Sequence, residues 1–244
     1  MKPEMLPKSE TCFFERDPGM ALARRATVEG VGTLFLMVAA TGAGLALRHL
    51  LPDNPALGLM AGAFATAGAL VGLIIAFGAV SGGHFNPLIS GLQWLGGERN
   101  LDCTLAYVAA QLLGALLGAL LANAMFGIGG QFTNAPPSWA LSCSEIVASA
   151  GLMIVVFGCA RSWRIETGPL AVGAWLSAAI MATPSTSYAN PAITLAAIFA
   201  DGPIALSVTT AVAYMAAQLV GALLAFLVVI IAYPRRAASD HELR

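Results

Sequence analysis

Long apolar runs separated by short polar segments make up most of the chain. An α-helix rises about 1.5 Å per residue, so roughly 17–25 apolar residues cross the hydrocarbon core of a bilayer. Six runs reach this length, the fifth only just: residues 26–47, 55–80, 101–126, 139–160, 167–183 and 204–233. We therefore expect an all-α membrane protein with six transmembrane helices.

Two further apolar segments are too short to cross a bilayer. Residues 86–94 follow the second run, residues 190–200 follow the fifth, and each segment opens on an Asn-Pro dipeptide. A helix of this length reaches roughly 15 Å, about half of the hydrocarbon core. Backbone that turns back at such a depth is tolerated only inside protein or against a watery cavity. The pattern predicts two re-entrant half-helices that meet end to end.

The two halves of the chain repeat one another. The stretch AAQLLGALLGALLA, from Ala109, matches AAQLVGALLAFLVV, from Ala216, and Glu29 in the first run has a counterpart, Glu145, in the fourth. Because three spans are an odd number, the second copy must have the opposite orientation in the membrane. We predict an inverted repeat. The expected limits are 26–127 and 139–234 for the two repeats, 26–234 for the whole membrane domain, and 1–25 and 235–244 for two cytoplasmic tails.

Composition and charge agree with a membrane protein. The chain is 58% hydrophobic and only 10% charged, with a mean hydropathy of +0.78, which excludes a soluble domain of this size. With both termini in the cytoplasm, every lysine and arginine except Arg48 lies on the cytoplasmic side. This pattern fits a bacterial inner membrane and equally a eukaryotic plasma membrane. A net charge of −1 gives no reason to expect a nucleic-acid partner.

The sequence contains no pattern typical of an enzyme. It has no Ser-His-Asp arrangement, no metal-ligand spacing and no phosphate-binding loop. The cysteines lack the CxxC spacing of zinc and redox sites, and we interpret them as packing thiols: Cys12, Cys103, Cys143 and Cys159. We expect no catalytic activity, no cofactor and no metal.

These features together resemble the aquaporin, or major intrinsic protein, family over about residues 20–236. The resemblance rests on the order of the spans and on Asn86-Pro87, Asn190-Pro191, His84, Glu29, Glu145, Gln111 and Gln218. A single Asn-Pro occurs in many turns, whereas two on half-helices related by an inverted repeat are highly specific. The resemblance implies the aquaporin fold and a passive channel. It also implies a homotetramer with one pore in each protomer.

The paired motifs suggest how such a pore excludes ions. Each half-helix N-terminus carries a partial positive charge of roughly half an electron, which disfavours cations at the membrane centre. Asn86 and Asn190 can each cap a half-helix while pointing an amide donor at the oxygen of a passing water or hydroxyl. Pro87 and Pro191 suit the first helical position, where no amide hydrogen is needed.

The resemblance also gives roles to residues around the motifs. Glu29 and Glu145 would accept hydrogen bonds from the re-entrant loops. His84 would lie on the cytoplasmic pore wall or simply brace its loop. The first motif carries Leu88 where the family usually has alanine, whereas the second keeps Ala192. Leu88 would either pack behind the asparagine or narrow the pore.

The selectivity filter departs from the family pattern. Water and glycerol channels of the family usually place an arginine directly after the second Asn-Pro-Ala, where this chain has Ile193. Counting back without gaps from the two asparagines gives the other filter positions as Thr66, Ala178 and Ser187. The predicted filter has no aromatic and no charge and should be wide. If the count slips by a residue, Tyr188 would restore an aromatic.

A wide, uncharged filter suits neutral solutes larger than water. Glycerol-like alcohols and urea are one class, and undissociated metalloid hydroxides such as arsenious acid are another. The stretch STSYANPAIT resembles a bacterial branch of the family that lacks the arginine and is associated with arsenic resistance. Some water should also pass.

Other functions stay open at this point. The channel could carry mainly water. A secondary transporter also uses broken helices and inverted repeats, but it normally needs an ionisable site at the midplane. Glu29 and Glu145 are the candidates for such a site, and their bracing role accounts for them. An ion channel would need rings of charge or of carbonyls, and a scaffold would leave the half-helices unexplained.

Overall fold

The computed structural model describes residues 19–128, 133, 135–161 and 165–233. Most of the two expected tails, residues 1–18 and 234–244, lies outside the described residues. The described ranges contain helices and turns and no strand. Their helices are α1 (Leu22–Leu50), α2 (Pro55–Ser81), α3 (Pro87–Leu95), α4 (Leu101–Met125), α5 (Trp139–Arg161), α6 (Gly168–Ala182), α7 (Pro191–Ala196) and α8 (Val208–Ala232), with 3-10 turns η1 (Ile165–Thr167) and η2 (Gly202–Ile204).

The expected six spans are present, and one of them is short. Helices α1, α2, α4, α5 and α8 are each long and apolar enough to cross a membrane. Helix α6, the expected fifth span, has only 15 residues because it begins at Gly168-Pro169, directly after η1. The all-α membrane fold predicted from the apolar pattern is confirmed.

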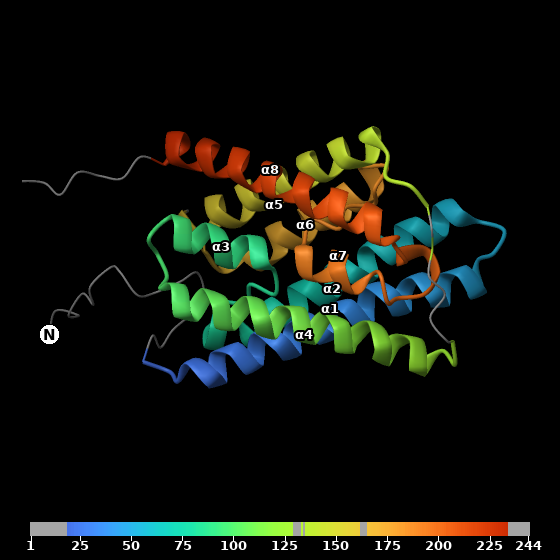
Figure 1. Cartoon of the computed structure of the whole chain (residues 1–244), viewed down its shortest axis with the longest axis horizontal. Coiled ribbons are helices and arrows are strands. Elements are labelled where there is room, and N and C mark those ends of the chain that lie inside the picture. The colour runs from blue at the N-terminus through green and yellow to red at the C-terminus, as the bar shows by residue number, and fades with distance from the viewer. Residues whose placement is uncertain (1–18, 129–132, 134, 162–164, 234–244) are drawn as a thin grey trace, which may run out of the picture.

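The helices are arranged as an inverted repeat. Helix α1 packs along α4, and the equivalent pair in the second half is α5 with α8. The half-helices α3 and α7 lie between these pairs and approach the middle of the molecule from opposite ends (Figure 1). Each starts at the proline of its Asn-Pro dipeptide, so the sequence motifs mark where the two N-termini meet.

Glycines allow the paired helices to approach closely. A Cβ atom at Gly114 of α4 would overlap the carbonyl oxygen of Gly30 in α1, and one at Gly221 of α8 would overlap that of Ile146 in α5. No side chain larger than hydrogen fits at either contact. Gly114 and Gly221 are matched positions in the repeated AAQ stretch, so the repeat preserves this contact.

The spans are apolar outside and polar inside. Large apolar side chains are exposed on their outer faces, among them Phe35, Ile75, Leu113 and Val212, each more than half exposed. Fully buried side chains include Glu29, Gln111, Glu145 and Gln218. A soluble protein would expose far less of its apolar side chains on contiguous faces. This distribution, together with the apolar spans, makes the chain an integral membrane protein.

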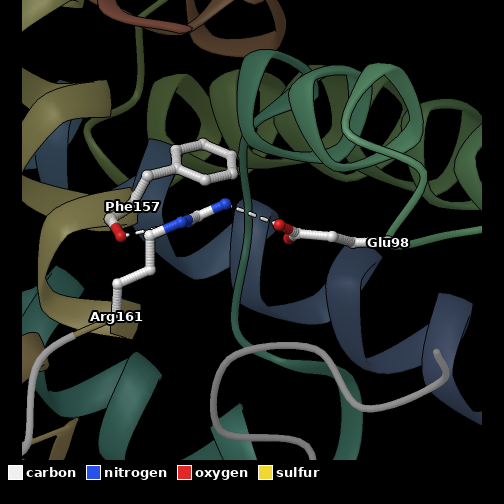
Figure 2. Close-up of polar contacts among 3 residues, drawn as sticks. All are labelled: Glu98, Phe157 and Arg161. Carbon is white, nitrogen blue, oxygen red and sulfur yellow. Dashed lines mark hydrogen bonds and ion pairs between the residues drawn. The ribbon is translucent and has the colours of Figure 1, made fainter. Parts of the chain in front are cut away.

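An ion pair ties the two repeats together at one end of the molecule. Nη2 of Arg161, at the end of α5, lies 2.6 Å from Oε1 of Glu98, in the loop after α3 (Figure 2). Nη1 of the same arginine donates to the carbonyl oxygen of Phe157 at 3.1 Å. The pair is partly exposed, so it positions the α3–α4 loop more than it stabilises the fold.

Candidate pore

The two asparagines bind each other's loops. Nδ2 of Asn86 donates to the carbonyl oxygen of Ala189, and Nδ2 of Asn190 donates to that of Phe85, both at 2.8 Å. Oδ1 of each asparagine accepts the amide of its own half-helix, from Leu88 at 2.9 Å and from Ala192 at 3.0 Å. Each side chain therefore caps one helix and fixes the loop in front of the other.

Glu29 supports the first re-entrant loop from inside the protein. Its Oε1 accepts the Ser81 hydroxyl at 2.6 Å and the His84 amide at 2.9 Å. Its Oε2 accepts the Phe85 amide at 2.7 Å and Nε2 of Gln111 at 2.8 Å. Four donors saturate one buried carboxylate, which is how a buried charge is made tolerable.

Glu145 makes the same set of contacts in the second repeat. Its Oε1 accepts the Ser185 hydroxyl at 2.6 Å and the Tyr188 amide at 3.0 Å. Its Oε2 accepts the Ala189 amide at 2.9 Å and Nε2 of Gln218 at 2.7 Å. The two carboxylates are therefore equivalent braces, as their matched places in the sequence suggested.

Both loops have left-handed backbone at matched positions. The φ angles are 92° at Gly82, 65° at Gly83 and 46° at Phe85. The second loop has 59° at Thr186, 52° at Ser187 and 44° at Ala189. Left-handed backbone at a residue with a side chain costs roughly 1–2 kcal/mol. The second loop uses it at three such residues, and the hydrogen bonds to Glu145 help to hold it there.

The loops line a continuous cavity of about 450 Å³. One end, here called the Arg48 mouth, is formed by Arg48, Leu51, Pro52 and Pro55, where α1 ends and α2 begins. The other end, the Cys159 mouth, is formed by Cys159, Ala160 and Gly168, where α5 ends and α6 begins. Asn86 and Asn190 line the cavity between the two mouths. The half-helix N-termini therefore face a passage through the molecule.

The cavity has a polar strip and apolar walls. The strip comes from the re-entrant loops, where no donor among the described residues reaches the carbonyl oxygens of Gly82, Gly83, Thr186 and Ser187. All four residues line the cavity together with the two asparagines, each of which has one amide N–H beyond the bond that it donates to the opposite loop. The apolar walls come from α1, α2, α5 and α6 and include Leu36, Leu70, Ile74, Leu152, Val156, Val172, Leu176 and Ile180.

Three of the four predicted filter residues line this cavity, and Ala178 does not. Thr66, Ser187 and Ile193 are wall residues, whereas Ala178 is exposed on the outer face of α6. The wall residue of α6 in this region is Ile180. Side chains two residues apart on a helix point about 200° away from each other around its axis. A count that is wrong by two residues therefore selects the opposite face. The gapless count was wrong here.

Tyr188 also lines the cavity, whereas the gapless count predicted a filter without an aromatic. Its hydroxyl donates to the carbonyl oxygen of Ile204 at 2.7 Å, and its ring packs edge-on to Tyr214 with centroids 5.5 Å apart. The alternative count, in which Tyr188 supplies an aromatic, agrees with this position. Ile193 also lines the cavity, and it is only 6% exposed.

The remaining predicted residues fall into two groups. His84 lines the cavity. It also braces its loop, because its Nδ1 lies 2.9 Å from the Ser90 hydroxyl and its ring is edge-on to Tyr107. Leu88 is buried in the core and is not among the cavity residues, which agrees with packing rather than narrowing. Ala192 is likewise fully buried.

Two serines in the site were not predicted from the sequence. Ser81 and Ser185 each donate to a bracing carboxylate and accept the amide two residues later, from Gly83 and Ser187, at 3.2 Å. A signal was available, since each serine stands five residues before the asparagine of its motif. Among the described residues, no cluster of three histidine, cysteine or acidic side chains could hold a metal ion.

Comparison with known proteins agrees with this architecture. The family model "Major intrinsic protein" matches residues 19–187 and 166–243. Aquaglyceroporin AqpS of Rhizobium meliloti (strain 1021) is 39% identical over 186 residues, covering 74% of this chain and 77% of the relative. Aquaporin TIP1-1 of Arabidopsis thaliana is 31% identical over 215 residues, covering 81% and 82%.

A solved structure, the aquaglyceroporin from Plasmodium falciparum, superimposes with a TM-score of 0.65. It covers 85% of this chain and 95% of its own, at 17% identity, and so supports the fold alone. The family match spans nearly the whole chain and agrees with the paired half-helices around the cavity. The chain therefore belongs to the major intrinsic protein family, whose members are membrane channels and not enzymes.

Proposed function

We propose that this channel passes small uncharged polyhydroxylated solutes passively through a wide filter that lacks arginine. The solutes are glycerol-like alcohols, metalloid hydroxides such as arsenious acid, or both, together with some water. The observation that carries the proposal is the amphipathic cavity, with a polar strip on one side and apolar walls on the other. The relative AqpS is named an aquaglyceroporin, which agrees with this solute class.

The polar strip matches the hydroxyl edge of a polyol. The asparagine amides donate, and the carbonyl oxygens of Gly82, Gly83, Thr186 and Ser187 accept. A glycerol-like molecule presents both donors and acceptors along one edge and C–H groups along the other. The hydroxyls can follow the strip while the carbons contact Leu176 and Ile180. Hydrogen bonds to the strip then replace the hydrogen bonds to water that the solute loses on entry.

The filter supports solutes larger than water. Ile193 occupies the position where the family usually has arginine, beside Thr66, Ser187 and Tyr188 on the cavity wall. An aliphatic side chain neither donates hydrogen bonds nor extends as far as a guanidinium. Arsenious acid carries three hydroxyls on a compact uncharged centre, so it presents the same surface chemistry as a small polyol.

Flux measurements on the unmodified protein test this proposal. Stopped-flow light scattering on proteoliposomes should give water, glycerol, urea and arsenious acid permeabilities well above those of protein-free vesicles. Glycerol entry should not change when a sodium or proton gradient is imposed. Water permeability with no increase for any larger solute would instead support a water channel. Uptake that requires a gradient would support a secondary transporter.

The orientation proposed is the one with both termini in the cytoplasm. Arg24, Arg25, Arg99 and Arg161 lie toward one end of the bundle, whereas Arg48 lies at the other, which fits the positive-inside rule. The Cys159 mouth then faces the cytoplasm and the Arg48 mouth faces outward. The membrane proposed is the plasma membrane of a bacterium. Protease sensitivity of a C-terminal tag only in inverted vesicles would support this orientation.

A homotetramer with one pore per protomer is also proposed. Gly68 and Gly72 of α2 face outward, and nothing in the described part of the chain lies within 4 Å of a Cβ built on either. Small residues at this spacing let helices of neighbouring subunits approach closely. These two glycines therefore have no packing partner within the described part of the protomer.

Enlarging this face should weaken the tetramer. The double substitution Gly68→Ile and Gly72→Ile is expected to lower the tetramer fraction about ten-fold at a fixed detergent concentration, by native mass spectrometry, because isoleucine prevents close approach. Ala109→Ile, on the exposed face of α4, is the matched control and should have no effect. An unchanged tetramer in the double variant would place the interface elsewhere.

A further inference from the structure

Arg48 occupies a distinctive position at one end of the cavity. It lies in the last turn of α1 and lines the Arg48 mouth together with Leu51, Pro52 and Pro55. Within the described part of the chain, it is the only lysine, arginine, aspartate or glutamate in the cavity lining. No described carboxylate lies within salt-bridge distance of it. Among the described residues, the cavity lining therefore has one full charge, which is positive and lies at a mouth. Asp53 follows in the α1–α2 loop, and Asp201 lines a neighbouring pocket together with Arg48.

The filter itself has no charged side chain that could repel cations. Ile193 stands where an arginine was expected, and the other filter residues are neutral. The half-helix N-termini contribute only partial charges, and these lie deep in the protein. A cation entering at the Arg48 mouth would meet no other full positive charge on the cavity wall before it reached the centre.

We infer that Arg48 is a specificity-determining residue of this channel. It lowers the concentration of cations in the mouth and offers hydrogen-bond donors to oxygen-rich neutral solutes before they reach the filter. Arg48 thus supplies at the entrance a positive charge and hydrogen-bond donors, neither of which Ile193 supplies in the filter. The inference rests on the proposed function, because it assumes that solutes use this cavity as their path.

The electrostatics favour an effect confined to the entrance. A guanidinium remains protonated throughout the pH range of proteins and presents five donors. The Debye length is about 8 Å at physiological ionic strength, so the charge acts on ions in the mouth and is weakly felt further away. Low-dielectric walls concentrate the field within the cleft. Arg48 can therefore select by charge without narrowing the path.

Urea and guanidinium provide a matched pair of probes, since they are similar in size and planar shape and differ in charge. The experiment compares their fluxes in proteoliposomes containing the full chain, at about 0.15 M salt. For Arg48→Glu we expect the guanidinium-to-urea flux ratio to rise by about ten-fold, and for Arg48→Gln by about three-fold. Arg48→Lys keeps the charge and should change the ratio by less than about two-fold.

Two controls separate this effect from others. Arg24→Glu reverses a charge of the same size on the same helix, but at its other end and outside the cavity lining, so the ratio should not change. Raising the salt to about 1 M shortens the Debye length to about 3 Å and should remove most of the increase in Arg48→Glu. Urea flux in every variant reports whether the pore remains folded and open.

The outcomes are distinguishable. A ratio in Arg48→Glu within about two-fold of the unmodified protein, with urea flux intact, would overturn the role of Arg48. An equal rise in Arg24→Glu would also overturn it, because the effect would then come from net charge. If the unmodified protein passed neither urea nor glycerol, the proposed function would fail, and a guanidinium flux that depends on residue 48 would still support the charge selection.

Discussion

Replacing Ile193 with arginine is expected to reduce glycerol, urea and arsenious acid flux by about ten-fold or more while retaining part of the water flux. A ten-fold reduction corresponds to about 1.4 kcal/mol in the barrier. Ile193 is buried in the cavity wall at the start of α7. The longer guanidinium would extend into the passage, where the Ser187 hydroxyl has no hydrogen-bond partner among the described residues and the nearby loop carbonyls can accept from it. Water is small enough to pass the narrowed section.

Stopped-flow light scattering on proteoliposomes measures this effect, and two further variants control for it. Ile193→Leu conserves volume and should leave all four permeabilities within about two-fold. Ala178→Phe should also have no effect, because Ala178 faces outward, whereas Ile180→Phe should reduce glycerol flux. Glycerol and metalloid rates unchanged in Ile193→Arg would mean that Ile193 does not line the constriction, and the filter assignment would be wrong.

The contrast between Ala178 and Ile180 shows what the sequence could and could not predict about the filter. Ile193 and Ser187 lie within three residues of Asn190, so the motif itself fixes their places on the wall. The α6 position is separated from that motif by a turn, in which the Thr186 amide donates to the carbonyl oxygen of Thr183. The number of residues in a turn depends on the three-dimensional structure. A count along the chain therefore misplaces the positions beyond the turn.

The half-helices and their braces were predictable for a different reason. An Asn-Pro dipeptide carries both a cap and a residue suited to the first helical position, so the two motifs define the starts of α3 and α7 locally. Glu29 and Glu145 were identifiable because an acidic residue is rare in an apolar span and had a counterpart in the repeat. Their partners Ser81 and Ser185 also stand at matched positions, five residues before each asparagine, but the signal is weaker because serine is common in membrane helices and in turns.

The backbone of the second loop was not predictable from residue type. Gly82 and Gly83 are suited to the left-handed conformation of the first loop, whereas Thr186 and Ser187 are not. Tertiary contacts override the local preference, because the Tyr188 and Ala189 amides both donate to Glu145. This makes the second loop depend more on its carboxylate than on its own sequence.

Glu145→Gln is therefore expected to destabilise the channel by about 1–3 kcal/mol, the cost of one unpaired buried donor, and to abolish most solute flux. All four contacts of the carboxylate are donors, and an amide can accept with only one of its two polar atoms. If the amide nitrogen replaces Oε2, it faces the Ala189 amide and Gln218. If it replaces Oε1, it faces the Tyr188 amide. Each donor left unpaired in the interior costs about 1–3 kcal/mol.

Melting temperature in detergent and glycerol flux after reconstitution measure the two effects together. Glu29→Gln should behave alike, since its carboxylate has the same four kinds of donor. Glu98→Gln is the matched control: its ion pair with Arg161 is partly exposed, so its loss should cost less than about 1 kcal/mol and leave flux intact. A Glu145→Gln protein as stable as the original, deficient only in uptake driven by a proton gradient, would contradict the bracing role. That result would support a transporter, because the carboxylate would then be needed for coupling and not for holding the loop.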